Sequence, residues 1–142
     1  MNATMTYADA IRFLYDLQLF GLKLGLENTR RLAELAGHPQ DHLRFLHVAG
    51  TNGKGSTCAM LESIHRAAGR RVGLFTSPHL VSFRERIQVD REPIGEAEVV
   101  RLVGRIREGL QAFPADHSPT FFEVVTVMAL SHFRERGCEL VV

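Results

Sequence analysis

The sequence has few cysteines, no long apolar run and no excess of charge of either sign, and each absence excludes a class of function. Only two cysteines occur among 142 residues, without C-x-x-C spacing, so neither a disulfide framework nor a cysteine metal site is supported. A net charge of +1 without a basic stripe argues against a nucleic-acid partner. The apolar run VVTVMAL is too short to span a bilayer, and the opening MNATMTYADA lacks the regions of a signal peptide. We therefore expect a cytoplasmic protein that binds neither membrane nor nucleic acid.

The length suits one domain with a buried core. Helical spacing and breaker residues predict helices over 6–20, 27–36, 56–68, 96–113 and 120–136. Short apolar runs predict buried strands over 44–48, 71–75 and 138–142, and RERIQV followed by DREPI predicts a strand leading into a turn. The succession of strand, helix and strand predicts an α/β fold, with a parallel sheet that has helices on both faces. In the helix 56–68 we expect these apolar residues to face inward: Met60, Leu61, Ile64, Ala67 and Ala68.

The stretch HVAGTNGKGST, residues 47–57, has the composition of a phosphate-binding loop. It lies between a predicted strand and a predicted helix, where backbone N–H groups and a helix N-terminus together attract an anion. Glycines let the backbone approach the anion closely, and Lys54 can reach the outer phosphates of a nucleotide. A hydroxyl at Ser56 or Thr57 can bind the accompanying magnesium ion. The alternative is a glycine-rich turn without a ligand, which this combination of residues disfavours.

The loop departs from the Walker A pattern G-x-x-x-x-G-K-[ST]. Only two residues separate Gly50 from Gly53, and Gly55 stands where that pattern has a hydroxyl. This spacing counts against a phosphate-loop kinase that acts on a small molecule, which remains an alternative function.

Five further residues are candidates for a site or for local structure. Ser77 follows the predicted strand 71–75, and since ligands lie beyond the carboxyl ends of parallel strands, it should neighbour the glycine loop; a local Ser-Pro turn is the alternative. His79 is assigned no role beyond loop structure or substrate contact. Thr120 and Glu123 form a T-x-x-E pattern that predicts a capping box. We expect Cys58 to be a small buried residue rather than a reactive thiol.

HVAGTNGKGST, VGLFTSPHLVSFRERI and PTFFEVVTVMAL together resemble the Mur ligase superfamily, and within it the bifunctional dihydrofolate synthase/folylpolyglutamate synthases. FGLKLGLENTRRLAELAGHPQ resembles the N-terminal helices of that family, so the resemblance covers essentially the whole chain. It implies the Mur-ligase-like central ATP-binding domain, with a helical lead-in over 1–43 and a phosphate-loop core over 44–142.

The resemblance implies an ATP-dependent carboxylate–amine ligase in which ATP phosphorylates a carboxylate and the amine of L-glutamate attacks the acyl phosphate. The implied cofactors are ATP and Mg²⁺, and the implied substrates are L-glutamate and dihydropteroate or a folate, in a monomeric enzyme. For ATP the implied residues are Thr51, Asn52, Gly53, Lys54, Gly55, Ser56 and Thr57, with Lys54 also catalytic. For the metal they are Ser77 and Ser56, and for the pterin or folate they are Thr120, Phe121, Phe122, Glu123, Leu24 and Gly25.

The resemblance also implies that the chain is the first part of a longer enzyme. After the strand that starts in CELVV, the family has a glutamate that binds magnesium, a modified lysine and a C-terminal domain that binds glutamate. We therefore expect a sheet truncated on its C-terminal side and an isolated chain that does not catalyse ligation. A nucleotide-binding module without catalysis is the alternative for these residues.

Overall fold

The computed structural model describes residues 5–17, 25–114 and 117–142, which fall into two compact units that alternate along the chain. The first unit contains the chain up to Pro39 and residues 96–131, and the second contains residues 40–95 and 132–142. The 3₁₀ helix η2 (Pro39–His42) lies where the chain passes from the first unit into the second.

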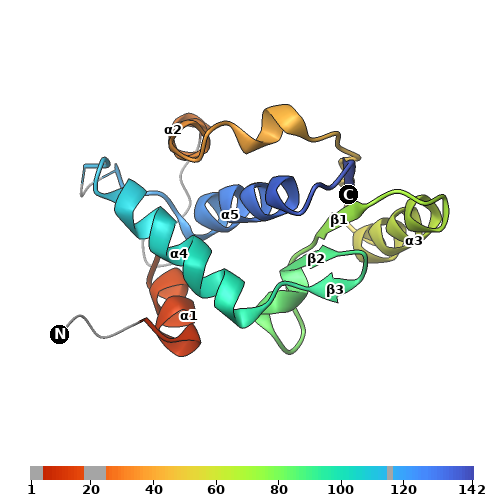
Figure 1. The fold of residues 1–142 in the computed structure, drawn as a ribbon, viewed down its shortest axis with the longest axis horizontal. Helices are drawn as coiled ribbons and strands as arrows, with labels where there is room; N and C mark the ends of the chain where they lie inside the picture. The colour runs from red at the N-terminus through yellow and green to blue at the C-terminus, as the bar shows by residue number, and fades with distance from the viewer. Residues whose placement is uncertain (1–4, 18–24, 115–116) are drawn as a thin grey trace. The chain divides into compact units, whose positions relative to one another are not determined.

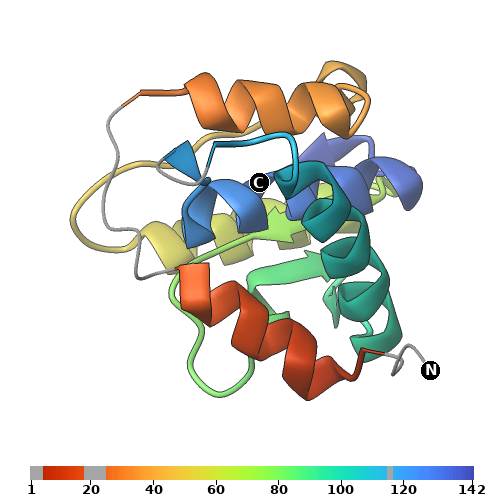
Figure 2. The same cartoon turned by 90° about the vertical axis from the view of Figure 1, so that its left-hand side faces the viewer.

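The first unit is helical, with α1 (Tyr7–Asp16), α2 (Glu27–Leu35), α4 (Glu96–Leu110) and most of α5 (Phe121–Glu135). Both α1 and α2 pack against α4, and Figures 1 and 2 show α1 running beside α4. Leu14 of α1 and Val103 of α4 are both fully buried, as expected of the inner faces of amphipathic helices. The four helices predicted from the sequence are confirmed, although α4 ends at Leu110 and not at residue 113. The predicted helix 6–20 ends at Asp16, and its residues 18–20 lie outside the described part.

The second unit is built on a four-stranded sheet in the order β3-β2-β1-β4. Its strands are β1 (Val72–Phe75), β2 (Ile87–Val89), β3 (Glu92–Pro93) and β4 (Leu140–Val141). β1 runs parallel to β4 and antiparallel to β2, which in turn pairs antiparallel with β3. The α/β class is thus confirmed, whereas the sheet is mixed and not wholly parallel as predicted.

Two local structures produce the antiparallel strands. After β1 the chain forms a loop and the 3₁₀ helix η3 (Phe83–Arg86), which reverse its direction before β2. Between β2 and β3 the turn consists of Asp90 and Arg91, both in the left-handed region with φ of 51° and 72°. Two central residues with positive φ match the right-handed twist of a hairpin. The strand leading into a turn, predicted from RERIQV and DREPI, is therefore present as β2 and this turn, whereas the return strand β3 was not predicted.

The segment 44–48, predicted as a buried strand, is only partly a strand. It forms one parallel bridge, between Phe45 and Val141, and the Leu46 N–H donates to the Val141 carbonyl at 2.8 Å. Phe45 keeps 47% of its surface exposed, so the segment is not buried. It therefore lies beside β4, which separates it from β1 in the sheet order.

Helical residues contact both faces of β1. Helix α3 (Lys54–Ala67) packs on the face that carries Val72 and Leu74. On the opposite face, Phe133 of α5 lies against Gly73, where an added Cβ would sit 2.7 Å from the ring. Successive residues of a strand point to opposite faces, so the two contacts cover both sides of the same strand. The predicted placement of helices on both faces is confirmed at this point.

The inner face of α3 is not the one that the sequence predicted. Met60 and Ile64, expected inside, are 58% and 63% exposed, whereas Cys58 and Glu62 are buried. The buried pair and Leu61 follow the spacing i, i+3, i+4, so α3 turns the adjacent stripe towards the sheet. The prediction failed because the inner face of α3 includes a glutamate, and apolar periodicity cannot identify a face that contains a charged residue.

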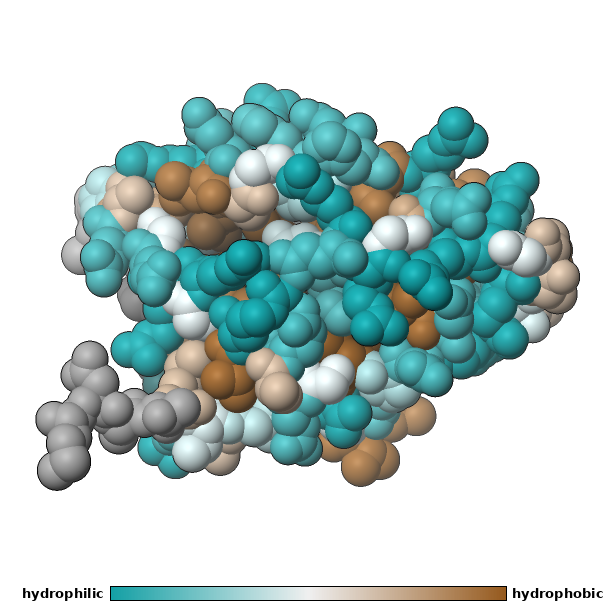
Figure 3. Space-filling model, viewed as in Figure 1, coloured by the Kyte–Doolittle hydropathy of each residue, from teal (hydrophilic) through white to brown (hydrophobic). Residues whose placement is uncertain are grey.

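The outer surface is dominated by polar side chains on the face drawn in Figure 3, with hydrophobic residues in separate patches. Among the described residues, none of the helices combines the length and the hydropathy that a membrane span requires.

Candidate functional site

The glycine loop leads into α3 without a side chain that caps the first backbone N–H groups of the helix. Gly53 is the N-cap of α3, in the left-handed region with φ of 76°, and it has no side chain to accept hydrogen bonds from the first turn. The first intrahelical bond of this end is donated by Thr57 to the Gly53 carbonyl, at 2.9 Å. The preceding N–H groups of the turn have no partner within the helix and carry the positive end of its dipole. The helix half of the predicted setting is therefore present, with α3 starting at Lys54, two residues earlier than expected, whereas the segment before the loop forms only the bridge at Phe45.

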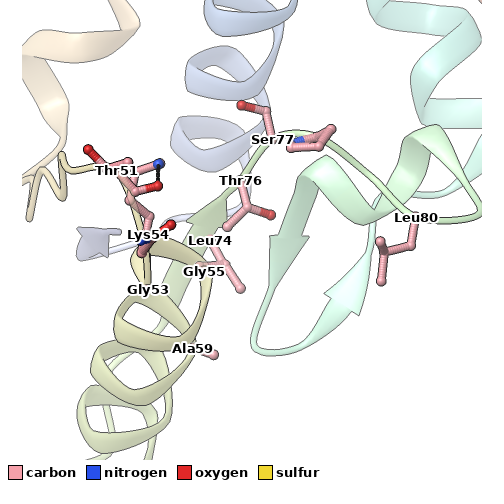
Figure 4. Close-up of a pocket in the computed structure, with 11 residues that line it drawn as sticks. Thr51, Gly53, Lys54, Gly55, Ala59, Leu74, Thr76, Ser77 and Leu80 are labelled. Carbon is pink, nitrogen blue, oxygen red and sulfur yellow. Dashed lines mark hydrogen bonds between the residues drawn. The ribbon is translucent and has the colours of Figure 1, made fainter.

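The Lys54 ammonium lies over its own loop. Nζ donates to the Gly50 carbonyl at 2.5 Å and to the Thr51 carbonyl at 3.2 Å. An ammonium has three N–H donors, so one further donor can be offered to an oxygen outside the loop. Figure 4 shows Lys54 and Thr51 on one side of a cavity. The contact places a positive charge at the mouth of the loop, next to the start of α3.

The glycine loop and the loop after β1 line one open cavity of about 500 Å³. Thr76 and Ser77, at the end of β1, lie across it from Lys54 (Figure 4). Its lining residues are Thr51, Asn52, Gly53, Lys54, Gly55, Ala59, Leu74, Thr76, Ser77, Pro78 and Leu80. The predicted neighbourhood of Ser77 and the glycine loop is confirmed. Ser56 and Thr57 are not among the lining residues, and both lie exposed in the first turn of α3.

Residues 76–82, termed the 76–82 loop, are held by polar contacts that the sequence analysis missed. The carboxylate of Glu85 accepts from three consecutive N–H groups, those of Leu80, Val81 and Ser82. These hydrogen bonds keep the pKa of Glu85 below its ordinary value, and the bond from the Leu80 N–H has the largest effect, ahead of those from Ser82 and Val81. Ser82 and Glu85 form the capping box of η3. The pattern S-F-R-E was the available signal, since it matches the spacing already recognised at Thr120.

His79 serves the structure of the same loop. The buried Arg86 donates from Nε to His79 Nδ1 at 2.8 Å, and the His79 ring packs edge-on against Phe83. This agrees with the structural role expected for His79. The Thr76 N–H also donates to the Arg86 carbonyl, at 3.1 Å, so Arg86 contacts both halves of the loop.

A metal ion at this cavity would rely on few protein atoms. Within residues 5–17, 25–114 and 117–142, no group of three or more histidine, cysteine, aspartate or glutamate side chains is placed to hold a metal. Ser77 offers a hydroxyl oxygen at the cavity wall. Mg²⁺ that accompanies a nucleotide is bound largely by phosphate oxygens and water, so one hydroxyl suits it. The donor set fits a metal carried by a ligand better than a resident metal.

The TFFE segment lies in the first unit and forms the predicted capping box. The Thr120 N–H donates to Glu123 Oε2 at 2.7 Å, and the Glu123 N–H donates to Thr120 Oγ1 at 3.4 Å. Thr29 donates its hydroxyl to Glu123 Oε1 at 3.4 Å, which ties α2 to the start of α5. The Glu123 carboxylate thus accepts hydrogen bonds from both Thr120 and Thr29.

The two phenylalanines of TFFE have different surroundings. Phe121 is buried and stacks on Tyr15 of α1, with ring centroids 5.6 Å apart and planes within 6°. Phe122 keeps 53% of its side chain exposed, so of the two it is the ring that can meet a ligand. Gly25 adopts a φ of 111°, and Leu24 lies outside the described residues. The roles assigned to these residues in binding a pterin stay predictions.

Comparison with known proteins gives consistent matches along the whole chain. The chain is 40% identical over 131 residues to the dihydrofolate synthase/folylpolyglutamate synthase of Bacillus subtilis, covering 91% of this chain and 30% of that protein. The solved folylpolyglutamate synthetase of Lactobacillus casei superposes with a TM-score of 0.90 at 35% identity, over 97% of this chain and 35% of the other. A folylpolyglutamate synthase complex with AMPPCP and folate superposes with a TM-score of 0.88 at 34% identity, over 97% of this chain and 34% of the other. No family model matches.

The chain spans about a third or less of the length of these relatives. A relative from Bos taurus, 33% identical over 97% of this chain and 27% of its own length, is named as a mitochondrial folylpolyglutamate synthase. Cytoplasmic localisation of the present protein therefore stays a prediction.

Proposed function

We propose that this chain, a homologue of the folylpolyglutamate and dihydrofolate synthases, forms the nucleotide-binding part of an ATP-dependent ligase that joins L-glutamate to dihydropteroate or to a folate. The observation that carries the proposal is the shared cavity at the end of β1 and the start of α3. It brings the glycine loop, Lys54 and Ser77 together, as expected of a site for a nucleotide and its metal.

The glycine loop would bind the phosphates of ATP. N–H groups at the start of α3 and the Lys54 ammonium supply positive charge where the transferring phosphoryl group gains negative charge. Gly53 and Gly55 let the backbone approach, since neither has a neighbour within 4 Å of an added Cβ. A phosphate oxygen would accept the third N–H of the Lys54 ammonium, and no protein nucleophile is required.

Magnesium, when bound with the nucleotide, would offset charge on the β- and γ-phosphates. Ser77 is the residue of this chain that we assign to it, because its hydroxyl lies at the cavity wall opposite Lys54. Ser56 is a weaker candidate, since it is exposed and does not line the cavity.

The acceptor would be a carboxylate on dihydropteroate or on the glutamyl tail of a folate. A relative solved with AMPPCP and folate supports these two classes of small molecule. Phe122 offers an exposed flat ring for a pterin, and Thr29 and Glu123, which are hydrogen-bonded to each other, offer polar atoms in the same unit. The phosphorylated carboxylate would then be attacked by the amine of L-glutamate, with release of inorganic phosphate.

Calorimetric titration of the purified chain with Mg-ATP tests the nucleotide site. We expect binding that is lost in Lys54→Ala and retained in Arg70→Ala, which removes one positive charge just beyond the other end of α3. Equal binding by the two variants would contradict the role of Lys54, and no binding by a folded wild-type chain would contradict the proposed site.

A second assay tests the ligase. We expect glutamate-dependent release of ADP from a protein that also contains the further length of the relatives, and none from the present chain alone. ADP release by the present chain in the presence of glutamate and folate would show that these residues suffice for the reaction.

A further inference from the structure

We propose that Glu85 is a positioning residue whose carboxylate fixes the 76–82 loop in the conformation that presents Ser77 to the phosphates and metal of a bound nucleotide. The inference rests on the nucleotide site proposed above. It assigns a role to a residue that lines no part of the cavity itself.

The contact between Glu85 and the loop is made entirely with backbone. Oε2 accepts from the Leu80 N–H at 2.8 Å, and Oε1 accepts from the N–H groups of Val81 at 3.0 Å and Ser82 at 2.7 Å. Three consecutive N–H groups that converge on one anion require one particular backbone conformation of these residues. Hydrogen bonds to a charged acceptor are the stronger kind, so the carboxylate selects this conformation over others.

Hydrophobic burial does not hold the tip of the loop. Leu80 and Val81 are 92% and 90% exposed, so their side chains contribute almost nothing to its order. A loop of this kind depends on its hydrogen bonds, and Glu85 supplies three of them. Arg86 adds two further contacts, one with the His79 ring and one with the Thr76 N–H.

Glu85 is itself fixed to the sheet. It belongs to η3, which leads directly into β2, and its own carbonyl accepts from Gln88 Nε2 at 2.9 Å. β2 pairs with β1, whose last residue precedes Thr76 and Ser77. The carboxylate of Glu85, which is anchored next to β2, therefore holds the loop that leaves β1, and β1 and β2 are themselves paired. Ser77 lies between the end of β1 and the residues bound by Glu85, so both anchors restrict its position.

Amide hydrogen exchange and nucleotide titration on three variants of the full chain test the proposal. In Glu85→Gln one acceptor oxygen becomes an N–H₂ donor that faces backbone donors, so at least one of the three contacts is lost. Glu85→Asp keeps the charge on a shorter side chain and should restore part of the effect. Glu92→Gln is the matched control, because Glu92 is an exposed residue of β3 outside the loop.

We expect Glu85→Gln to accelerate exchange of the amides of residues 80–82 by about tenfold or more, with exchange in β1 unchanged. Its affinity for Mg-ATP should fall about tenfold while its affinity for ATP without metal changes by less than about twofold, since the glycine loop is untouched. A purely structural role would weaken both forms of the nucleotide alike.

The outcomes separate this proposal from the one on which it rests. Unchanged exchange at residues 80–82 in Glu85→Gln would overturn it, as would faster exchange with wild-type affinity for Mg-ATP, or an equal loss for both forms of ATP. A folded wild-type chain that binds no nucleotide would instead contradict the proposed function, and the role of Glu85 in nucleotide binding with it.

Discussion

Nε of Arg91 lies 2.5 Å from Oε2 of Glu62, a carboxylate of α3 that has no exposed surface. The other carboxylate oxygen accepts from Arg66 Nε at 2.9 Å. The two arginine side chains remain 44% and 42% exposed, so the buried member of this cluster is the anion. The cluster joins α3, which begins at the glycine loop, to the hairpin turn between β2 and β3.

Removal of Arg91 should destabilise the protein more than removal of Glu62. Arg91→Met leaves a buried carboxylate with one partner, which we expect to cost about 2 kcal/mol of unfolding free energy. Glu62→Met removes the buried charge and leaves two arginines that can reach water, at a cost of about 1 kcal/mol or less. Urea denaturation of both variants measures the difference.

The control for this comparison is Arg101→Met, which breaks the exposed ion pair with Glu98 on α4. It should change the unfolding free energy by less than about 1 kcal/mol. A Glu62 variant that is less stable than the Arg91 variant would show that the carboxylate is stabilised by more than its two arginines.

Gly73→Ala should weaken the packing of Phe133, near the end of α5, on β1. The new methyl carbon would lie 2.7 Å from Cδ1 of Phe133, which is fully buried. We expect a loss of about 1–3 kcal/mol, typical of overpacking, measured by thermal denaturation. Gly73→Ala combined with Phe133→Leu should recover part of the loss.

Gly104→Ala provides a control of opposite sign. Gly104 is within α4, and an added Cβ would meet Met5 at an ordinary distance of 3.8 Å. Alanine in a helix is favoured over glycine, so this variant should gain about 0.5–1 kcal/mol. A loss in Gly104→Ala similar to that in Gly73→Ala would contradict the assignment of the Gly73 effect to contact with Phe133.

Substitutions at two glycines of the glycine loop should separate an effect on stability from an effect on binding. Gly53 has a φ of 76°, so Gly53→Ala costs about 1 kcal/mol in backbone strain even though its Cβ would meet nothing within 4 Å. Gly55 lies in α3 and lines the cavity, so Gly55→Ala should keep the melting temperature but lower the affinity for Mg-ATP. Melting and calorimetry on both variants check this. An unchanged affinity in Gly55→Ala would mean that the nucleotide does not approach this part of the loop.

Cys138 should be unreactive in the folded protein. Burial raises the pKa of its thiol to about 11, Asp90 acts in the same direction, and Arg71 and Arg136 oppose it. At pH 8 only about 0.1% of such a thiol is ionised, so alkylation should be slow until the chain is unfolded in urea. Fast labelling of Cys138 without denaturant would contradict its burial. Burial also raises the pKa of the Cys58 thiol, so Cys58 should likewise be alkylated slowly in the folded protein.

The same shift gives a pH dependence of stability. A folded pKa above the ordinary 9.0 means that the folded state holds the proton more tightly than the unfolded state. The contribution of Cys138 is therefore complete below pH 9 and is lost as the pH rises from 9 towards 11. Because Cys138→Ala lacks this titration, its stability relative to wild type should improve over that range. Urea denaturation at pH 8 and pH 10.5 measures it.

The sequence predicted the glycine loop, its place before a helix, and the approach of Ser77 to it. These features depend on residues close together in the chain and on one general property of parallel strands, namely that their carboxyl ends share an edge. The capping box at Thr120 was predicted for the same reason. The box at Ser82 carried the same signal, and its Glu85 proved to hold the loop on which Ser77 lies.

Local periodicity and the positions of the glycines were enough to predict the helices, the α/β class and the glycine loop before α3. The folded structure was needed to show that β2 runs antiparallel, that the segment 44–48 pairs through a single bridge, and that α3 buries Glu62 and exposes Met60. Each of these depends on partners distant in the chain. A buried carboxylate is tolerated only where an arginine from another element meets it, and no local pattern in α3 could show that Arg91 would do so.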